Sequence, residues 1–187
     1  MIRPLSATLV FSLAAGAAWA QSKAAMPAPG PKAKTATTMY MLSESGPGKV
    51  AGTIVPLSSG PDGVTFDIDL KGVAPGVHGF HLHENPSCEN TIKNGKTVPG
   101  DAAGGHYDPE KTGIHAGPNG KGHLGDLPRL TAGQDGIIKK SVIAPRLSLA
   151  DVEGRSLMLH AGGDNYKDEP KPLGGGGARM ICGVVGK

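Results

Sequence analysis

Apolar and polar residues alternate along several short segments of the chain, as they do in β-strands with one buried face. Residues 63–70 show this most clearly, because Val64, Phe66, Ile68 and Leu70 are separated by Thr and Asp. Five further apolar runs are also expected to be strands: residues 39–42, 50–57, 137–144, 156–160 and 179–185. A helical pattern is found only as a short turn near residues 147–152.

Turn sequences that combine Gly with Pro or Asp separate the expected strands. They are Gly46-Pro47-Gly48, Gly60-Pro61-Asp62-Gly63, Ala74-Pro75-Gly76 and Gln134-Asp135-Gly136. Short strands joined by such turns predict an all-β fold, an antiparallel sandwich or barrel. Residues 84–135 and 161–178 are Gly-rich and polar, and they do not fit strands. Loops this long are uncommon unless they serve a function or are disordered.

The first 20 residues have the features of a secretory signal peptide. Arg3 supplies a positive start, residues 5–18 are mostly apolar, and Ala18-Trp19-Ala20 has the form of a cleavage site. The alternative is a membrane anchor, but the apolar run is shorter than the roughly 20 residues that a span needs. We therefore expect cleavage after Ala20, a flexible Ala, Pro and Lys-rich tail over residues 21–37, and one folded domain over residues 38–187.

The composition excludes several classes of protein. With 30 Gly, 16 Pro and few aromatic residues among 187, the chain is not a coiled coil. Four of its 19 basic residues and none of its 16 acidic residues precede residue 38, so residues 38–187 carry a formal net charge of −1. This charge argues against nucleic acid as a partner. The mature chain contains no second long apolar run, so no membrane association is expected after cleavage.

Two cysteines, Cys88 and Cys182, are present in the whole chain. In an exported protein, which folds in an oxidising compartment, an even pair favours one disulfide bond. Two free buried thiols are the alternative. A bond between the two would close a loop of 94 residues, which is worth about 4–5 kcal/mol on the chain-entropy model.

Two of the seven histidines, His81 and His83, stand two residues apart in an expected strand. Because side chains alternate along a strand, their rings share one face, while Phe80 and Leu82 share the opposite face. Two imidazoles in this arrangement are close enough to bind one ion together. Two solvated histidines on a sheet surface are the alternative for an isolated pair.

Four more metal-binding groups follow in the first Gly-rich stretch and weaken that alternative. His106, His115, His123 and Asp126 offer three nitrogens and one carboxylate, a set that suits tetrahedral zinc. A long loop needs an internal cross-link to be ordered, and a bound metal supplies one. His160 ends another expected strand and begins the second Gly-rich stretch.

Seven segments together resemble the bacterial, periplasmic copper–zinc superoxide dismutases. They are His-Gly-Phe-His-Leu-His-Glu (78–84), Asn-Pro-Ser-Cys (85–88), Gly-Gly-His-Tyr-Asp-Pro (104–109), Gly-His-Leu-Gly-Asp-Leu-Pro (122–128), His-Ala-Gly-Gly-Asp-Asn (160–165), four glycines (174–177) and Ala-Arg-Met-Ile-Cys-Gly (178–183). The resemblance implies a Greek-key antiparallel β-sandwich or flattened barrel, immunoglobulin-like, with eight strands and two long functional loops. It also implies a periplasmic enzyme that converts superoxide to dioxygen and hydrogen peroxide and protects the cell envelope.

By this resemblance the cofactors are copper and zinc, with one histidine shared between them. The implied copper ligands are His81, His83, His106 and His160. The implied zinc ligands are His106, His115, His123 and Asp126. An all-imidazole set suits a copper ion that changes oxidation state, whereas a set with a carboxylate suits redox-silent zinc.

Further roles are implied for residues around these ligands. Arg179 resembles an arginine beside the copper that favours a small anion. Asp164 resembles an aspartate that hydrogen-bonds one ligand of each metal, and His78 a structural histidine that is not a ligand. A bond between Cys88 and Cys182 would tie the segment after His83 to the strand that carries Arg179. Four lysines are candidates for steering the substrate: Lys93, Lys96, Lys167 and Lys171.

Two other functions are weighed against the enzyme. One is a metal-binding or copper-buffering protein on the same scaffold. A zinc-only relative of this kind could lose any of His81, His83, His160 and Arg179, whereas this chain has all four. An adhesion module would explain the strands but not the histidines. The expected partner is therefore superoxide, in a protein that is either a monomer or a homodimer.

Overall fold

The computed structural model describes residues 35–58 and 60–186. The expected signal peptide and nearly all of the expected tail lie outside the described residues, and both stay predictions. The strand β1 begins at Thr37, the last residue assigned to the tail from the sequence. No helix among the described residues is both long and apolar enough to cross a membrane.

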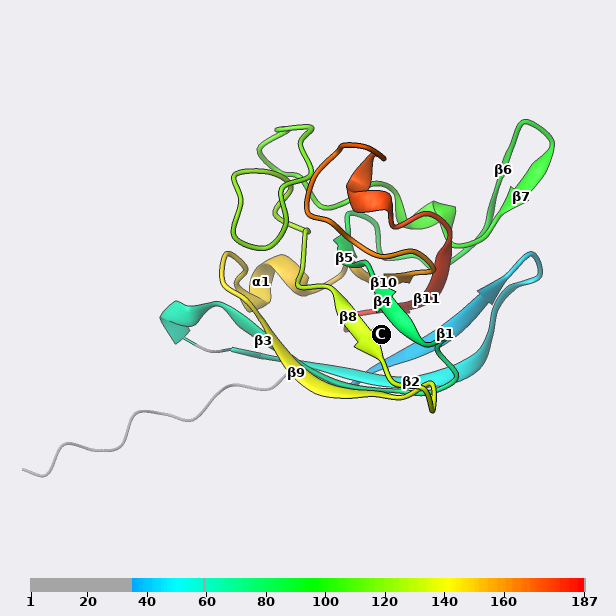
Figure 1. Ribbon diagram of the computed structural model, residues 1–187, viewed down its shortest axis with the longest axis horizontal. Coiled ribbons are helices and arrows are strands. Elements are labelled where there is room, and N and C mark those ends of the chain that lie inside the picture. The colour runs from blue at the N-terminus through cyan, green and yellow to red at the C-terminus, as the bar shows by residue number, and fades with distance from the viewer. Residues whose placement is uncertain (1–34, 59, 187) are drawn as a thin grey trace, which may run out of the picture. The chain divides into compact units, whose positions relative to one another are not determined.

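Strands dominate the part of the chain that the structure describes (Figure 1). They are β1 (Thr37–Ser43), β2 (Gly46–Ser58), β3 (Val64–Leu70), β4 (Gly76–His78), β5 (Phe80–His83), β6 (Thr91–Lys93), β7 (Lys96–Val98), β8 (Leu130–Ala132), β9 (Ile138–Ala144), β10 (Ser156–His160) and β11 (Arg179–Val184). A four-residue helix, α1 (Leu149–Val152), lies where the sequence predicts a short helical turn. Three single 3-10 turns cover Gly60–Asp62, Asp101–Ala103 and Leu173–Gly175.

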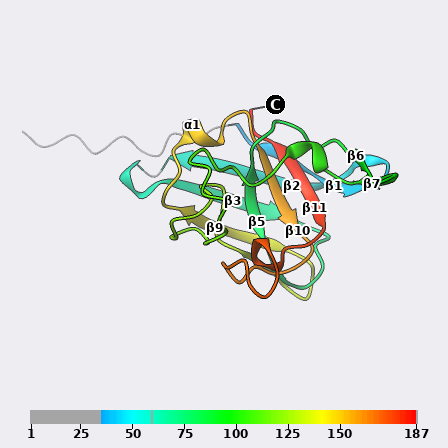
Figure 2. The same cartoon turned by 90° about the horizontal axis from the view of Figure 1, so that it is seen from above.

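Seven strands form one antiparallel sheet in the order β5-β10-β11-β1-β2-β3-β9. The C-terminal strand β11 returns to pair with β1, the kind of long connection that defines Greek-key folds. The sheet curls over, so that β5, β10 and β11 lie above β2, β3 and β9 in Figure 1 and cross them in Figure 2. The rings of Phe66 on β3 and Phe80 on β5 meet edge to face at 5.7 Å between centroids. The all-β antiparallel architecture predicted from the sequence is confirmed.

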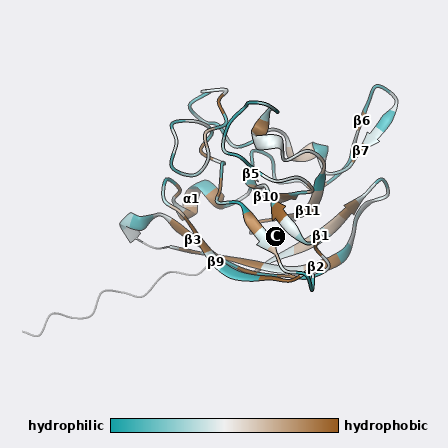
Figure 3. Cartoon of the chain, in the orientation of Figure 1, coloured by the Kyte–Doolittle hydropathy of each residue, from teal (hydrophilic) through white to brown (hydrophobic). Residues whose placement is uncertain are grey.

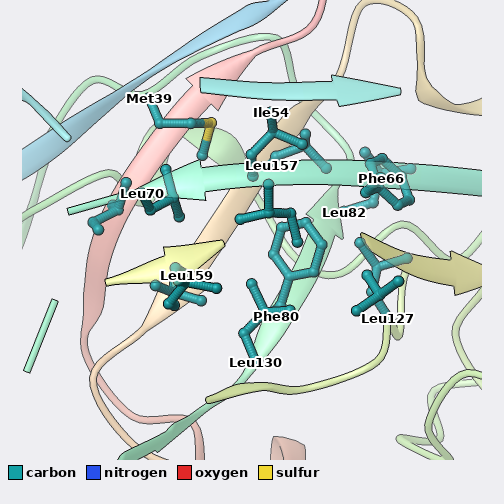
Figure 4. Close-up of a cluster of buried hydrophobic side chains, with 14 of the residues drawn as sticks. Met39, Ile54, Phe66, Leu70, Phe80, Leu82, Leu127, Leu130, Leu157 and Leu159 are labelled. Carbon is teal, nitrogen blue, oxygen red and sulfur yellow. The ribbon is translucent and has the colours of Figure 1, made fainter. Parts of the chain in front are cut away.

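The core fills the space inside the curled sheet (Figure 4). Along β3 the apolar residues of the alternating pattern are the buried ones, while its Thr and Asp side chains point outward. Each large apolar side chain removed from water contributes about 1.5–3 kcal/mol. Figure 3 shows the apolar residues concentrated on the strands and the polar ones on the loops. The hydrophobic pattern therefore decides which face of each strand turns inward.

Two details of the predicted chain path are wrong. Gly46-Pro47-Gly48 is predicted as a turn but begins β2, and the turn lies at Glu44 and Ser45 instead. The first Gly-rich stretch, residues 84–135, also contains three short strands. Of these, β6 and β7 form a hairpin and β8 pairs with β4. These strands are only three residues long, so they carry too few positions for an alternating pattern to be recognised.

Both faces of β5 and β10 are buried. One face, with Phe80 and Leu82 of β5, packs into the core. The other face carries His81 and His83, which are 0% and 1% exposed. In Figure 1 the long loops before β8 and after β10 lie on this side of the sheet. These loops convert a sheet surface into a buried polar site.

Candidate metal centre

The first Gly-rich loop is attached to the free edge of β5. This strand ends the sheet, and its unpaired backbone groups would otherwise face solvent. The amide of Tyr107 donates to the carbonyl of Leu82 at 2.8 Å, and the amide of Leu82 donates to the carbonyl of Gly125 at 2.9 Å. Each end of the loop thus adds a short antiparallel bridge to β5. The bridges set His106 opposite His83 and Asp126 opposite His81.

One group of four histidines gathers where β5 and β10 approach the loop. Its members each offer a ring nitrogen, and these nitrogens lie within 4.8 Å of one another: His81, His83, His106 and His160. The Nδ1 atoms of His83 and His160 donate to the carbonyls of Gly104 and Gly177, which leaves both Nε2 atoms as acceptors. These two Nε2 atoms face each other at 3.4 Å. Two facing lone pairs need a cation or a proton between them.

A second buried group lies within the loop and contains His106, His115, His123 and Asp126. One oxygen of Asp126, Oδ1, lies 3.0, 2.9 and 3.3 Å from the Nδ1 atoms of the three histidines. Its other oxygen accepts from the amides of Ala116 and Gly117, which fixes the carboxylate. Three imidazole nitrogens and one carboxylate oxygen therefore converge on one point.

The ring of His106 belongs to both groups. Its Nδ1 faces Asp126, and its Nε2 is buried without a hydrogen-bond partner in the structure. The Nδ1 atoms of His81, His115 and His123 are also buried without a hydrogen bond. Unpaired polar atoms in an interior are costly unless something else binds them. Two metal ions, one on each side of His106, fit this set of donors.

Burial keeps most of these imidazoles neutral, which is the form that binds a metal. Removal from water lowers the pKa of His81, His83 and His106, and it lowers the pKa of His160 to about 4. His115 differs, because the carboxylates of Asp126 and Asp164 outweigh its burial and raise its pKa to about 9.

Asp126 is held as a carboxylate in the second group. Burial raises its pKa, but the adjacent rings of His106 and His115 and the amide of Ala116 outweigh burial, so its pKa lies well below the usual value. The second group thus contains a negative charge that the first group lacks. A dication is stabilised by this charge.

Asp164, from the second Gly-rich loop, connects the two groups. Its Oδ2 accepts from Nε2 of His81 and its Oδ1 accepts from Nε2 of His115, both at 2.8 Å. These bonds determine that both histidines present Nδ1 to a metal. One carboxylate therefore orients a ring in each group.

Arg179 stands beside the first group, directly opposite His160 in the pairing of β10 with β11. Its guanidinium donates to the carbonyls of Gly100 and Gly104, each at 2.6 Å. The side chain is 18% exposed, unlike the buried histidines, so it is in contact with solvent. It is a fixed cation within reach of a small anion that approaches the group.

The disulfide between Cys88 and Cys182 is present, as predicted, with its two Cα atoms 5.7 Å apart. It links the segment after β5 to β11, the strand on which Arg179 lies. The bond therefore joins the two parts of the chain that carry histidines and Arg179.

The other residues singled out in the sequence lie outside the two groups. Both ring nitrogens of His78 lie 2.8 Å from carbonyl oxygens, those of His160 and Ala74. Lys93 pairs with Asp101, whose carboxylate is also 3.7 Å from Arg179. Lys96, Lys167 and Lys171 are exposed.

Sequence reasoning missed Asp101 and Asp168. The carboxylate of Asp168 accepts from the backbone amides of His115 and Leu173, and so it bridges the two loops. Its partners are backbone groups, which leave no side-chain pattern to find. The role of Asp101 could be recognised only once the fold shows that its segment lies beside the hairpin of β6 and β7.

Comparison with known proteins agrees with this geometry. The sequence model described as "Copper/zinc superoxide dismutase (SODC)" matches residues 50–185. The chain belongs to the copper/zinc superoxide dismutase family. It is 55% identical over 152 residues to a Cu-Zn superoxide dismutase of Brucella abortus, covering 81% of this chain and 87% of that protein.

Solved structures of superoxide dismutases resemble this fold. The Cu/Zn enzyme from Brucella abortus superposes with a TM-score of 0.79 at 54% identity, over 82% of this chain and 99% of that one. The monomeric enzyme from Salmonella enterica gives a TM-score of 0.73 at 49% identity, with the same coverage of both chains. Dismutation of superoxide is the activity of the family, and copper and zinc are its cofactors.

Proposed function

We propose that this superoxide dismutase binds its copper at His81, His83, His106 and His160, and its zinc at His106, His115, His123 and Asp126. The observation that carries the proposal is the single buried ring of His106, which has one nitrogen toward each group. The carboxylate of Asp126 favours a redox-silent dication on its side. The all-imidazole group suits copper.

The reaction consumes two superoxide anions and two protons and yields one dioxygen and one hydrogen peroxide. When bound, copper supplies the one-electron redox chemistry and zinc supplies a fixed positive charge. Nε2 of His106 has no other hydrogen-bond partner. It would bind the copper, and it would hold one of the two protons only in the part of the cycle in which it is free of the metal. Arg179 attracts and orients the anion with a guanidinium held by two carbonyls.

Asp164 and the disulfide hold the histidine rings and Arg179 in fixed positions relative to one another. The two oxygens of Asp164 orient His81 and His115, so each ring presents the same nitrogen in every molecule. The bond between Cys88 and Cys182 holds Arg179 near the histidines of β5. Preorganised groups cost little reorganisation when the anion arrives.

The protein acts in the periplasm, after cleavage of residues 1–20, as a defence of the cell envelope against superoxide. The features of a signal peptide in those residues support this location. The relative from Salmonella enterica, described as monomeric, supports a monomer for this chain as well. Sedimentation of the mature protein tests this, and a dimer at low micromolar concentration would contradict it.

Metal analysis of paired variants tests the ligand assignment. Loaded wild-type protein should bind about one copper and one zinc per chain. His160→Ala should lose copper and retain zinc, and His123→Ala should lose zinc and retain copper. The opposite losses would overturn the assignment. Wild-type protein that binds only zinc after copper loading, without dismutase activity, would indicate a metal-binding protein instead.

A further inference from the structure

Arg146 lies outside the two metal groups but contacts the loop that carries the second one. Its guanidinium donates from Nε to the carbonyl of Pro118 at 3.2 Å and from Nη1 to the carbonyl of Gly122 at 3.0 Å. Its Nη2 donates to the carbonyl of His123, the residue assigned to zinc above. One side chain thus holds three backbone carbonyls within six residues of irregular loop.

Two of these acceptors, the carbonyls of Pro118 and Gly122, need a donor from elsewhere in the fold. Pro118, Gly122 and His123 are buried, and buried carbonyls that lack a partner are destabilising. A guanidinium offers five N–H groups in a rigid plane, so it can satisfy three carbonyls at once. An ammonium group is a point charge on a flexible stem and cannot match all three positions.

The backbone of Arg146 is itself well fixed. It lies between the end of β9 and helix α1, and its neighbour Leu147 is buried in the core. Ser148 then forms a capping box with Asp151 at the start of the helix. The guanidinium therefore extends from a rigid base, and the loop is the part that adapts to it.

The carbonyl of His123 also accepts from the amide of Asp126, at 3.3 Å. Arg146 consequently holds in place the one-turn segment of residues 123–126, which carries two of the four groups assigned to zinc, His123 and Asp126. The charge on Arg146 is directed at carbonyls and not at the carboxylate of Asp126. Its effect is on where the ligands lie, with no direct contact to the metal.

We propose that Arg146 is a positioning residue that holds the loop of residues 118–123 in its metal-binding shape and slows the release of zinc. The proposal rests on the zinc assignment made above. Partners that orient metal ligands typically change metal affinity about 10- to 100-fold when they are removed. Loss of Arg146 should act in the same direction by freeing the segment between Pro118 and Asp126.

Zinc release from the fully loaded protein to a chromophoric chelator tests the proposal. Arg146→Met should release zinc about tenfold faster than wild type or more. Arg146→Lys should be nearly as fast, because charge alone does not replace three hydrogen bonds. Lys121→Met is the matched control, since it removes one positive charge from an exposed position of the same loop. It should release zinc at the wild-type rate.

Two further measurements separate positioning from general stability. Cobalt(II) bound in place of zinc should show a changed visible absorption in Arg146→Met but not in Lys121→Met, because the ligand geometry is altered. The unfolding midpoint of metal-free Arg146→Met should be modestly lower than that of Lys121→Met, because buried carbonyls lose their donor, so the cobalt spectrum decides between the two roles. If Arg146→Met does not fold, the same comparison is made with Arg146→Lys.

The proposal is overturned if the Arg146 variants release zinc as slowly as Lys121→Met. It is also overturned if their faster release comes with an unchanged cobalt spectrum and a lower midpoint of the metal-free protein, which would indicate a loss of global stability. If wild-type protein binds no zinc at this group, the proposed function fails as well. That result is distinguishable because it precedes any comparison of variants.

Discussion

Each histidine around β5 and β10 has one ring nitrogen fixed by the protein, and this decides which nitrogen remains for a metal. His83 and His160 donate from Nδ1 to backbone carbonyls, whereas His81 donates from Nε2 to Asp164. Burial also keeps the pKa of these rings low. Tautomer and charge are therefore set before any metal binds.

At the same scale, Arg179→Ala should lower the rate of superoxide consumption about tenfold and weaken its dependence on salt. The physical reason is the loss of a fixed positive charge beside the first histidine group. Rates measured at several ionic strengths, with metal content checked in each sample, test this. Arg179→Lys, which retains the charge, should keep part of the salt dependence. An unchanged rate in Arg179→Ala with both metals bound would remove Arg179 from the mechanism.

Metal-free protein should lose stability in acid. The pKa of His160 falls from its ordinary 6.5 to about 4 on folding, so the unfolded chain binds more protons between these values. This contribution is present above pH 6.5 and is lost as the pH falls toward 4. His115 acts in the opposite sense at higher pH, because its pKa is raised to about 9 and its contribution is lost as the pH rises through that value. Denaturant midpoints of the metal-free protein, measured from pH 4 to 9, check both effects. A midpoint that does not fall between pH 6.5 and 4 would contradict the prediction.

The edge strand β5 and the loop attached to it form the element on which the site depends. Gly125 allows the close approach, because a Cβ atom there would lie 2.2 Å from the carbonyl oxygen of Leu82. The loop can therefore lie flat against β5 and bring Asp126 to the histidines. A larger residue would have to move either the loop or the strand.

We predict that Gly125→Ala destabilises this contact by about 1–3 kcal/mol, the usual cost of overpacking. The melting temperature should fall by several degrees, and zinc content should fall with it. Gly105→Ala is the control, because its Cβ would meet only a side-chain oxygen of Glu84 at an ordinary 3.4 Å. Equal melting temperatures and metal contents for the two variants would show that the close approach does not matter.

Reduction of the disulfide tests a second link between elements. Its loop spans 94 residues, so the chain-entropy model gives about 4–5 kcal/mol of stabilisation. Reduced protein should melt several degrees lower than oxidised protein. The double variant Cys88→Ser, Cys182→Ser should show the low value in both conditions. A reducing agent that leaves the wild-type melting temperature unchanged would contradict the prediction.

At the scale of the whole domain, the two sides of the curled sheet have different roles: one forms the apolar core and the other carries the metal-binding residues. Its inside is an apolar core, and the outer side of β5 and β10 carries the histidines under the long loops. Because ligands come from β5, β10 and the first loop, none of these parts can form the site alone. Metal binding and folding of the domain should therefore stabilise each other.

The strands that bury one face were predictable, because their alternating residues report the core directly. The hairpin of β6 and β7 was missed although it carries a strong signal. Its turn residues Asn94 and Gly95 both have positive φ, as the Asn-Gly turn of a two-residue hairpin requires. The site was predicted through the spacing of the histidines and a family resemblance. The role of Arg146 left no trace in the sequence, because its partners are backbone carbonyls of a distant loop.

The central claim is that one imidazole, that of His106, contacts two unlike metal ions. Anomalous diffraction from crystals of the loaded protein, recorded at the copper and zinc absorption edges, tests it most directly. We expect one copper peak beside Nε2 and one zinc peak beside Nδ1 of the same ring. Two peaks without a common histidine between them, or two peaks of the same element, would contradict the account.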